Sequence, residues 1–306
     1  MTAAISIVIP THNRRELLLR TLASALAQEA IDFEVVVIDD GSTDGTAEAI
    51  RVLNDRRIRV LRNERSVGVA AARNMGVEAA RGAWIALLDD DDLWSPQKLQ
   101  QQLGAAKATG SGWVYAGSVE VDQHGVIFSG DPPPSPKKLL ASLLDKNLMP
   151  AGSSNVIIRA DLFRDVGGFD VRLRLIADWD LWLRLAPTGP PACVPQPLVA
   201  YRFHFGQSTL DSYSMIAEGR IVAERHGANL NSVRRWLAWS YLRRGERFSA
   251  LREYARAGFD GDLSSFGRAA VVALHPRPMT VRRRFRGGGL EWQRSAESWL
   301  RPLRDK

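Results

Sequence analysis

The most chemically distinctive segment of the chain is a run of four consecutive carboxylates, Asp89, Asp90, Asp91 and Asp92. They follow residues 84–88 (WIALL), an apolar run typical of a buried strand in a parallel sheet. Two carboxylates about 4 Å apart repel by about 4 kcal/mol at an effective dielectric constant of about 20. A divalent cation offsets that repulsion, and clustered oxygen ligands favour Mg²⁺ or Mn²⁺. The alternative is a solvated acidic turn that also caps the next helix.

A second apolar run, residues 33–38 (FEVVVI), also stops at two acids, Asp39 and Asp40. The turn-forming residues 41–46 (GSTDGT) then redirect the chain and cap a helix. Ligands of open α/β sheets bind outside the carboxyl ends of the strands, and residues 89–92 lie at such an end. We therefore favour the metal-binding interpretation of the acid run.

Strands and helices alternate along the first third of the chain. Strands are predicted over residues 5–9, 33–38, 58–61 and 84–88, and helices over residues 17–26 and 69–80. This alternation predicts an α/β fold with a doubly wound, mostly parallel sheet. A dinucleotide-binding domain would need G-x-G-x-x-G after the first strand, where this chain has PTHNR, so we exclude that class.

The bulk composition is that of a globular protein with one large core. The chain has 306 residues, of which 45% are apolar, enough for an α/β core and a smaller appendage. A spanning helix needs about 20 apolar residues, and the sequence holds no such run. The single cysteine, Cys193, excludes an internal disulfide and suits a reducing cytoplasm. Residues 5–9 have no basic region before them, so we expect a strand there rather than a signal peptide.

Charge is divided unevenly along the chain. Residues 1–224 carry 23 Lys/Arg and 27 Asp/Glu, a net charge of −4, whereas residues 225–306 carry 18 and 7, a net charge of +11. The basic part is predicted to be helical, with a hairpin of helices over residues 232–241 and 248–257 and a last helix that carries Trp292 and Trp299. Such a division indicates that the two parts do different jobs.

Two interpretations of the basic part stay open. Arginines interleaved with aromatic residues, as in residues 282–286 (RRRFR), suit an anionic membrane surface. The alternative is a solvated helical cap on the first domain. No nucleic-acid-binding motif accompanies the arginines, so we do not expect nucleic acid as a partner.

Four tracts, taken in order, resemble the inverting glycosyltransferases of family 2, which have the GT-A fold. These tracts are residues 8–14 (VIPTHNR), 37–46 (VIDDGSTDGT), 88–96 (LDDDDLWSP) and 178–182 (DWDLW). The resemblance implies a GT-A domain over residues 1–213, with a nucleotide-binding half (1–95) and an acceptor half (96–213), followed by the basic helical region, residues 214–306.

The resemblance implies that a nucleotide-sugar donor is held at the strand ends. The residues implied to bind its nucleotide part are Pro10, Thr11, His12, Asn13, Asp39, Asp40, Arg73, Asp89 and Asp90. Asp39 would accept the imide hydrogen of uracil or thymine, and His12 would stack on the base. The alternatives are a polar loop residue for His12, helix capping for Asp39, and a surface cation for Arg73.

The family's D-x-D pattern maps onto residues 89–91. By that resemblance Asp91 would bind the Mn²⁺ or Mg²⁺ ion that bridges the donor diphosphate and acts as a Lewis acid on the departing oxygens. His204, within the tract of residues 201–208 (YRFHFGQS), resembles a family residue near metal or phosphate. The alternative for His204 is an ordinary surface histidine.

The resemblance also assigns a general base. Asp178 stands where the family has the carboxylate that takes the proton of the acceptor hydroxyl, although the usual preceding Glu is replaced by Ala177. Asp180 is the second candidate, and the alternative is that Asp178 only caps its helix. One base opposite one leaving group predicts a single displacement with inversion at the anomeric carbon.

Four further residues are candidates for the acceptor and sugar site. Ser153 and Ser154 belong to a loop of small residues that resembles the family loop beside the acceptor. Trp94 and Trp179 could stack on a sugar, although their spacing also fits core positions.

The resemblance implies transfer of a hexosyl unit from a UDP- or dTDP-sugar to a glycan or glycolipid in cell-envelope polysaccharide biosynthesis. We expect a cytoplasmic enzyme, associated with the inner face of the plasma membrane if the basic region binds lipid. The chain lacks the Q-x-x-R-W motif of processive synthases, so we expect one sugar to be added per encounter. The alternatives are an inactive nucleotide-sugar-binding scaffold, or a D-x-D phosphatase, whose nucleophilic Asp usually follows the first strand.

Overall fold

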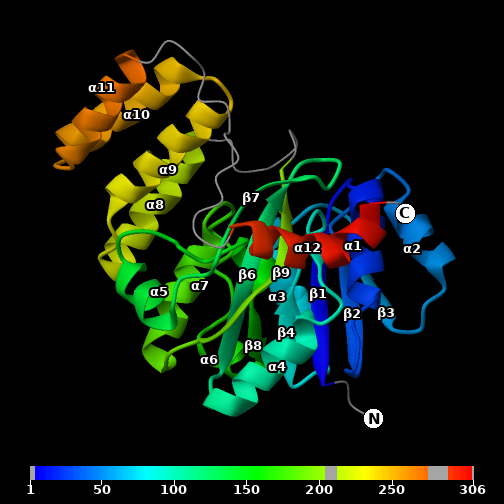
Figure 1. The fold of residues 1–306 in the computed structure, drawn as a ribbon. Helices are drawn as coiled ribbons and strands as arrows, with labels where there is room; N and C mark the ends of the chain where they lie inside the picture. The colour runs from blue at the N-terminus through cyan, green and yellow to red at the C-terminus, as the bar shows by residue number, and fades with distance from the viewer. Residues whose placement is uncertain (1–3, 204–211, 275–288, 305–306) are drawn as a thin grey trace.

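The computed structural model describes residues 4–203, 212–274 and 289–304. One mixed sheet of nine strands forms its centre, and helices cover both faces (Figure 1). The strand order is β3-β2-β1-β4-β8-β6-β9-β5, and β7 pairs with β6. The strands are β1 (Ile5–Thr11), β2 (Phe33–Asp39), β3 (Ile58–Arg62), β4 (Trp84–Leu87), β5 (Leu93–Trp94), β6 (Trp113–Val121), β7 (Ile127–Asp131), β8 (Ile157–Arg159) and β9 (Ala192–Arg202).

Twelve α-helices connect and cover these strands in the part of the chain that is described. They are α1 (Arg15–Leu26), α2 (Thr46–Leu53), α3 (Val69–Ala79), α4 (Lys98–Thr109), α5 (Pro136–Ser142), α6 (Ala160–Asp165), α7 (Ala177–Leu185), α8 (Ser212–His226), α9 (Leu230–Arg243), α10 (Arg247–Phe259), α11 (Ser264–Leu274) and α12 (Gly289–Arg304). Short 3₁₀ turns, η1 (Gly152–Asn155) and η2 (Ala186–Thr188), precede β8 and β9.

The first four strands pair in parallel, as the sequence predicts. β1 lies between β2 and β4, with Ile5 opposite Phe33 on one side and Trp84 on the other. All seven residues of β1 and of β2 are buried, because helices cover both faces of the sheet. The carboxyl ends of these strands therefore lie at one edge of the sheet, and the acid runs that follow β2 and β4 lie there together.

The second half of the sheet is mixed. β8 runs antiparallel to both β4 and β6. β5 runs antiparallel to β9, and β7 runs antiparallel to β6, whereas β9 is parallel to β6. β9 has eleven residues and lies inside the sheet between β6 and β5. Its two prolines, Pro195 and Pro197, coincide with a shift of register against β6, which is where a ladder tolerates them.

Alternate side chains of the first strands belong to two different core clusters, one on each face of the sheet. Val8, Val36 and Ile38 face α3 and α7, whereas Ile7, Val35 and Val37 face α1 and α4. Helix α3 approaches the sheet closely at Gly76, where a Cβ would stand 2.5 Å from Val8 Cγ1 and from Ile38 Cδ1. This close approach brings Arg73, one turn earlier on α3, to the edge of the sheet that carries the acids.

The C-terminal part is helical, and its last helix returns to the sheet. Figure 1 shows α9, α10 and α11 standing away from the sheet, while α12 lies across it beside α1. Trp292 of α12 lies against Gly117 and Gly130, and Trp299 Nε1 donates to the carbonyl of Pro197 at 3.0 Å. The domain division at residue 213 stays a prediction, and α12 packs on the sheet across that division.

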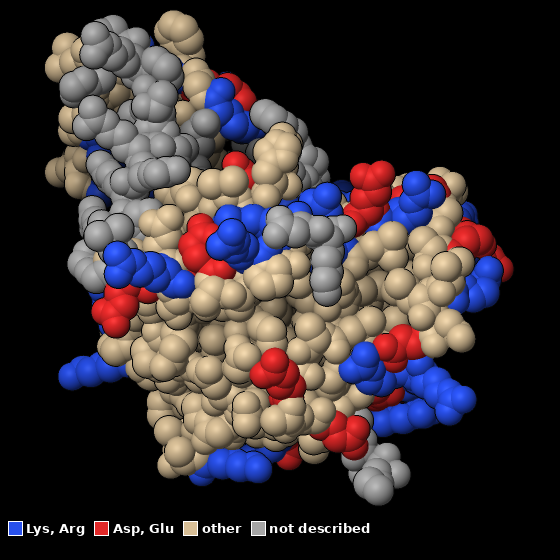
Figure 2. Space-filling view, turned by 45° about the vertical axis from the view of Figure 1, so that its right-hand side comes forward, with Lys and Arg blue, Asp and Glu red and all other residues tan. Residues whose placement is uncertain are grey.

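Several arginines in the helical part are paired with acids elsewhere in that part. Arg234 lies 3.3 Å from Glu253, and Arg235 forms an ion pair with Asp262. On the face drawn in Figure 2, basic and acidic side chains are interspersed and form no single basic patch. The choice between a helical cap and a membrane-binding surface stays open. Residues 282–286 lie outside the described residues, and no helix within the described ranges is long and apolar enough to span a membrane.

We predict that Gly76→Ala destabilises the protein by about 1 to 3 kcal/mol, because the added methyl group overpacks the contact between α3 and the sheet. Gly104→Ala is the matched control. Gly104 is an exposed glycine inside α4, and a methyl group added there would have no atom within 4 Å, so alanine should stabilise by about 0.5 to 1 kcal/mol. Urea denaturation measures both, and equal effects of the two substitutions would contradict the packing described.

Candidate active site

The acid run after β4 is tied to the end of the neighbouring strand. Thr11 Oγ1, at the end of β1, donates to Asp90 Oδ2 at 2.7 Å. The Nη1 atom of Arg14 lies 2.9 Å from Asp90 Oδ1 and 2.9 Å from Asp91 Oδ2. Asp90 and Asp91 are buried. Burial, and then the charge of Asp91, raise the pKa of Asp90 to about 6, although Arg14 and Thr11 oppose that shift.

Asp89 faces the other side of the edge, toward α3 and the loop before β8. Its carboxylate forms an ion pair with Arg73, and its backbone N–H donates to Ser154 Oγ at 3.0 Å. Arg73 is 7% exposed, and its Nε has no hydrogen-bond partner among the described residues. A buried guanidinium with a donor to spare, beside a partly exposed carboxylate, is suited to bind an anion such as phosphate.

The fourth acid, Asp92, points into the protein. It is completely buried, and its Oδ1 accepts the backbone N–H of Arg202 at 3.0 Å. Its Oδ2 is buried without a hydrogen-bond partner in the described part of the chain. Burial, followed by the charges of Asp91 and Asp89, raises the pKa of Asp92 well above its usual range.

The acids after β2 occupy two different environments. Asp39 is fully buried, its Oδ1 accepts the backbone N–H of Ser42 at 2.8 Å, and its Oδ2 lies 3.6 Å from Arg62. The carboxylate of Asp40 instead accepts four donors from residues 63–68, namely the side chains of Asn63 and Ser66 and the backbone N–H groups of Val67 and Gly68. Asp40 therefore fixes the loop that leads into α3.

The turn after β1 brings the remaining nucleotide-site candidates together. Asn13 has a left-handed backbone (φ 53°), and its Oδ1 accepts the backbone N–H of Thr43 at 2.8 Å. His12 is exposed, and its Nδ1 lies 2.7 Å from the carbonyl oxygen of Asp40. Pro10 is buried at the end of β1. Exposed His12 and Asn13 thus line the surface beside buried Asp39.

Asp178 stands at the first turn of α7 and is half-buried. Its Oδ1 accepts the backbone N–H of Trp179 at 2.7 Å, and its Oδ2 accepts Nδ2 of Asn147 at 3.3 Å. Burial raises its pKa, the charge of Arg73 lowers it, and that of Asp89 raises it. Asp178 therefore lies within the electrostatic reach of Arg73 and of Asp89 in the acid run.

Gly152 leaves room beside this carboxylate. A Cβ on Gly152 would stand 3.2 Å from Asp178 Oδ2, and its φ of +50° is a conformation that favours glycine. At this position the loop of small residues therefore places no side chain against Asp178 Oδ2.

The environment of Asp180, the second candidate base, does not suit a general base. Its carboxylate is fully buried and lies 2.7 Å from Arg184, 2.6 Å from Arg225 and 2.9 Å from His226. Burial would raise its pKa, but His226 and the two arginines outweigh it and hold the pKa below the ordinary value. A carboxylate held by three cationic or donor groups is a poor proton acceptor, and its role is to join α7 to α8.

Two candidates for the sugar site, Trp94 and Trp179, are core residues. Trp94 is fully buried and its Nε1 donates to the carbonyl of Ser154, while Trp179 is 4% exposed and donates to the carbonyl of Leu143. Burial leaves neither ring a face for stacking on a sugar. Ser153 and Ser154 are also buried, and Ser154 positions the backbone of Asp89.

Sequence reasoning missed three residues that the structure brings to the site. Arg14 contacts two of the acids, and Glu218 of α8 accepts the backbone N–H groups of residues 174–176 just before α7. The pKa of Tyr201 is raised well above its usual range, first by burial and then by the negative charges of Asp92, Asp91, Asp89 and Asp178. Arg14 and Tyr201 belong to tracts already singled out, whereas nothing local marks Glu218. His204 lies outside the described residues.

The donor set fits a divalent ion that is shared with a substrate. The described residues contain no group of three or more His, Cys, Asp or Glu side chains able to enclose a metal. Mg²⁺ is usually held by one or two carboxylates together with substrate phosphates, and Asp91 with its neighbours supplies such carboxylates.

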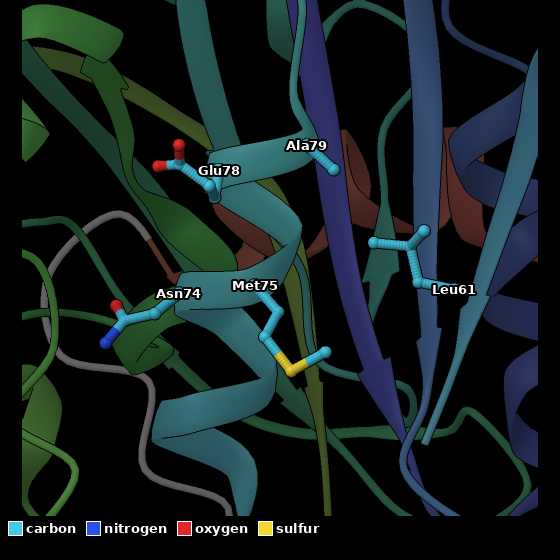
Figure 3. Close-up of a pocket in the computed structure, with 5 residues that line it drawn as sticks. All are labelled: Leu61, Asn74, Met75, Glu78 and Ala79. Carbon is cyan, nitrogen blue, oxygen red and sulfur yellow. The ribbon is translucent and has the colours of Figure 1, made fainter. Parts of the chain in front are cut away.

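A hollow on the outer face of α3 is not part of this site. The hollow is lined by Leu61 of β3 and by Asn74, Met75, Glu78 and Ala79 of α3; Figure 3 shows Met75 and Ala79 on the side of Leu61, whereas Asn74 and Glu78 point away from it. None of these residues is a predicted site residue, and Asn74 Nδ2 already donates to the carbonyl of Phe169 at 2.8 Å.

Comparison with known proteins agrees with this architecture. The model of glycosyl transferase family 2 matches residues 6–167. The succinoglycan biosynthesis protein ExoO of Rhizobium meliloti is 29% identical over 222 residues, 67% of this chain, and this chain spans 62% of that relative. The UDP-Glc:alpha-D-GlcNAc-diphosphoundecaprenol beta-1,3-glucosyltransferase WfgD of Escherichia coli is 26% identical over 208 residues, 68% of this chain and 79% of WfgD.

A solved structure shows the same fold over nearly the whole chain. The mannosyltransferase PcManGT of Pyrobaculum calidifontis, solved with GDP-Man and Mn²⁺, superposes with a TM-score of 0.55 and 18% identity. The match covers 99% of this chain and 86% of PcManGT. The fold is that of the GT-A glycosyltransferases, with the acid run at the carboxyl ends of its parallel strands. This chain belongs to glycosyl transferase family 2, which confirms the resemblance seen in its sequence.

We predict that Asp180→Asn lowers the free energy of unfolding by about 3 to 5 kcal/mol, because it leaves buried cations without their anion. A lowered pKa means that this stabilisation is present above the ordinary pKa of the carboxyl and is lost as the pH falls through its folded-state pKa. The difference from the unsubstituted protein should therefore shrink in acid. Urea denaturation at neutral and acid pH measures it, and a difference that stays constant would refute this role.

Proposed function

We propose that this protein is an inverting glycosyltransferase that moves a sugar from a UDP- or dTDP-sugar to a hydroxyl of a glycan or glycolipid. The acceptor class rests on the relatives, one named for succinoglycan biosynthesis and one for transfer to a diphosphoundecaprenol-linked sugar. The observation that carries the proposal is the position of Arg73. It pairs with Asp89 of the acid run, and its charge lowers the pKa of Asp178, which supports placing the donor-binding and base candidates in one site.

Donor recognition is assigned to the ends of β1 and β2. Asp39 has an Oδ2 with no hydrogen-bond partner among the described residues, so it can accept the imide N–H of a uracil or thymine ring. His12 and Asn13 are exposed beside it and would cover the base. Asp40 contributes indirectly, because its carboxylate already holds residues 63–68.

The donor diphosphate is assigned to the acid run and Arg73. Asp91, with Asp89 and Asp90 beside it, would hold a divalent ion. That ion, when bound, supplies Lewis-acid stabilisation of the departing diphosphate. Arg73 would donate to the diphosphate oxygens from a buried position, where a charge-assisted hydrogen bond is stronger than in water.

Asp178 is assigned the proton transfer. Its carboxylate takes the proton of the acceptor hydroxyl while the hydroxyl oxygen forms a bond to the anomeric carbon. The bond from that carbon to the diphosphate oxygen breaks, and the diphosphate leaves with the electron pair. Attack opposite the leaving group inverts the anomeric centre. The raised pKa of Asp178 makes it a stronger base than a solvated aspartate.

We predict that Asp178→Asn lowers kcat by about 10²- to 10⁴-fold and leaves nucleotide affinity unchanged, because the amide cannot accept the proton. Initial rates and calorimetric titration with UDP measure the two quantities. Asp161→Asn is the matched control, since Asp161 is an exposed acid in the first turn of α6. Full activity of the Asp178 variant would remove this residue from the mechanism.

We predict that Asp91→Asn abolishes the effect of Mn²⁺ on nucleotide binding. A ligand at about 100 times its dissociation constant stabilises a protein by roughly 2.7 kcal/mol, so a thermal-shift assay with UDP and Mn²⁺ detects binding. The unsubstituted protein and the control Glu48→Gln, an exposed acid on α2, should respond alike. An undiminished response of the Asp91 variant would show that the ion lies elsewhere.

A further inference from the structure

Arg14 connects the turn after β1 to the acid run. Its Nη1 atom lies 2.9 Å from a carboxylate oxygen of Asp90 and 2.9 Å from one of Asp91. The guanidinium is largely buried, with 24% of its side chain exposed, and the two carboxylates are at most 10% exposed. One cation thus neutralises part of the charge of two adjacent, poorly solvated acids.

The backbone holds Arg14 in this position. Asn13 precedes it in a left-handed conformation, and its backbone N–H donates to Ser42 Oγ at 2.9 Å. The backbone carbonyl of Arg14 accepts the N–H of Leu18 in the first turn of α1. The guanidinium is therefore aimed at the acid run by a turn that is anchored on both sides.

In this arrangement the Arg14 guanidinium and a bound divalent ion would compete for the carboxylate of Asp91. A divalent ion bound to Asp91 would stand within a few ångströms of the guanidinium, and like charges repel strongly at partly buried sites. Diphosphate oxygens would relieve that repulsion, because they supply anionic ligands to the ion and acceptors to the guanidinium.

We propose that Arg14 competes with the divalent ion for Asp91 and thereby makes ion binding depend on the nucleotide diphosphate. This inference rests on the proposed function. It adds that the ion and the donor bind cooperatively. Arg14 acts on the reaction through Asp91 and is thus a positioning residue. A purely structural Arg14 would give the opposite sign, because its loss would loosen the acid run and weaken ion binding.

The test is a calorimetric titration with Mn²⁺, with and without UDP, at a pH well above the pKa of Asp90. Arg14→Gln should bind Mn²⁺ alone about tenfold or more tightly than the unsubstituted protein, since a repelling charge is gone. In the unsubstituted protein UDP should tighten Mn²⁺ binding about tenfold or more, and by linkage Mn²⁺ should tighten UDP binding equally. That coupling should shrink in Arg14→Gln.

Three variants separate charge from structure. Arg14→Met keeps the apolar stem and should match Arg14→Gln, while Arg14→Lys keeps the charge and should bind Mn²⁺ alone as weakly as the unsubstituted protein. The control is Arg15→Gln, because Arg15 is a neighbouring exposed arginine, and this substitution should leave Mn²⁺ binding unchanged. Thermal unfolding checks that each variant is folded.

Unchanged or weaker Mn²⁺ binding by folded Arg14→Gln or Arg14→Met would overturn the proposal and leave the proposed function intact, provided that UDP and Mn²⁺ still bind. If both neutral variants fail to fold, the unsubstituted protein decides, because absence of coupling between UDP and Mn²⁺ would overturn the proposal by itself. Failure of the unsubstituted protein to bind UDP at all would instead overturn the proposed function.

Discussion

Repulsion among neighbouring carboxylates is the constraint on which the site depends. Asp89, Asp90, Asp91 and Asp92 follow one another at the end of β4, and three of the four are buried. The fold offsets their charge with cations from two directions, Arg14 from the turn after β1 and Arg73 from α3. Neither cation could reach the run without the parallel pairing of β1 with β4 and the close packing of α3 on the sheet.

A network of buried hydrogen bonds supports the acid run from the side of η1 and α4. Ser154 accepts the backbone N–H of Asp89, and Trp94 donates to the carbonyl of Ser154. Fully buried Lys98 lies 3.9 Å over the ring of Trp94 and donates to Gln102, which in turn donates to the carbonyl of Asn155. Buried polar groups that are satisfied in this way fix one arrangement of the loop.

The helix that carries Asp178 is held from the C-terminal part of the chain. Glu218 accepts three backbone N–H groups just before α7, and Arg225 and His226 contact Asp180 within it. Helix α8 is therefore a structural partner of the candidate base, which gives the helical region a role independent of any membrane surface.

The sequence predicted those features that depend on local pattern. Buried parallel strands appear as continuous apolar runs, so β1 to β4 and the acids that follow them could be placed, and the four tracts indicated the family. Features that depend on distant partners could not be predicted. Trp94 and Trp179 have the composition of a sugar site but are buried, and two of the three partners of Asp180, Arg225 and His226, are 45 and 46 residues away in the chain.

The extent of β9 could not be predicted either, because its prolines suggest a loop where the ladder instead shifts its register. Arg14 belongs to the tract of residues 8–14, but its contact with Asp90 and Asp91 could not be predicted, because that contact depends on the pairing of β1 with β4.

The central claim is that the acid run holds a divalent ion together with a nucleoside diphosphate. Anomalous diffraction at the manganese edge, from crystals grown with UDP and Mn²⁺, tests this claim most directly. The account predicts one strong peak within coordination distance of an Asp91 carboxylate oxygen and of the diphosphate. UDP bound at the ends of β1 and β2 with no manganese peak at Asp91 would contradict it.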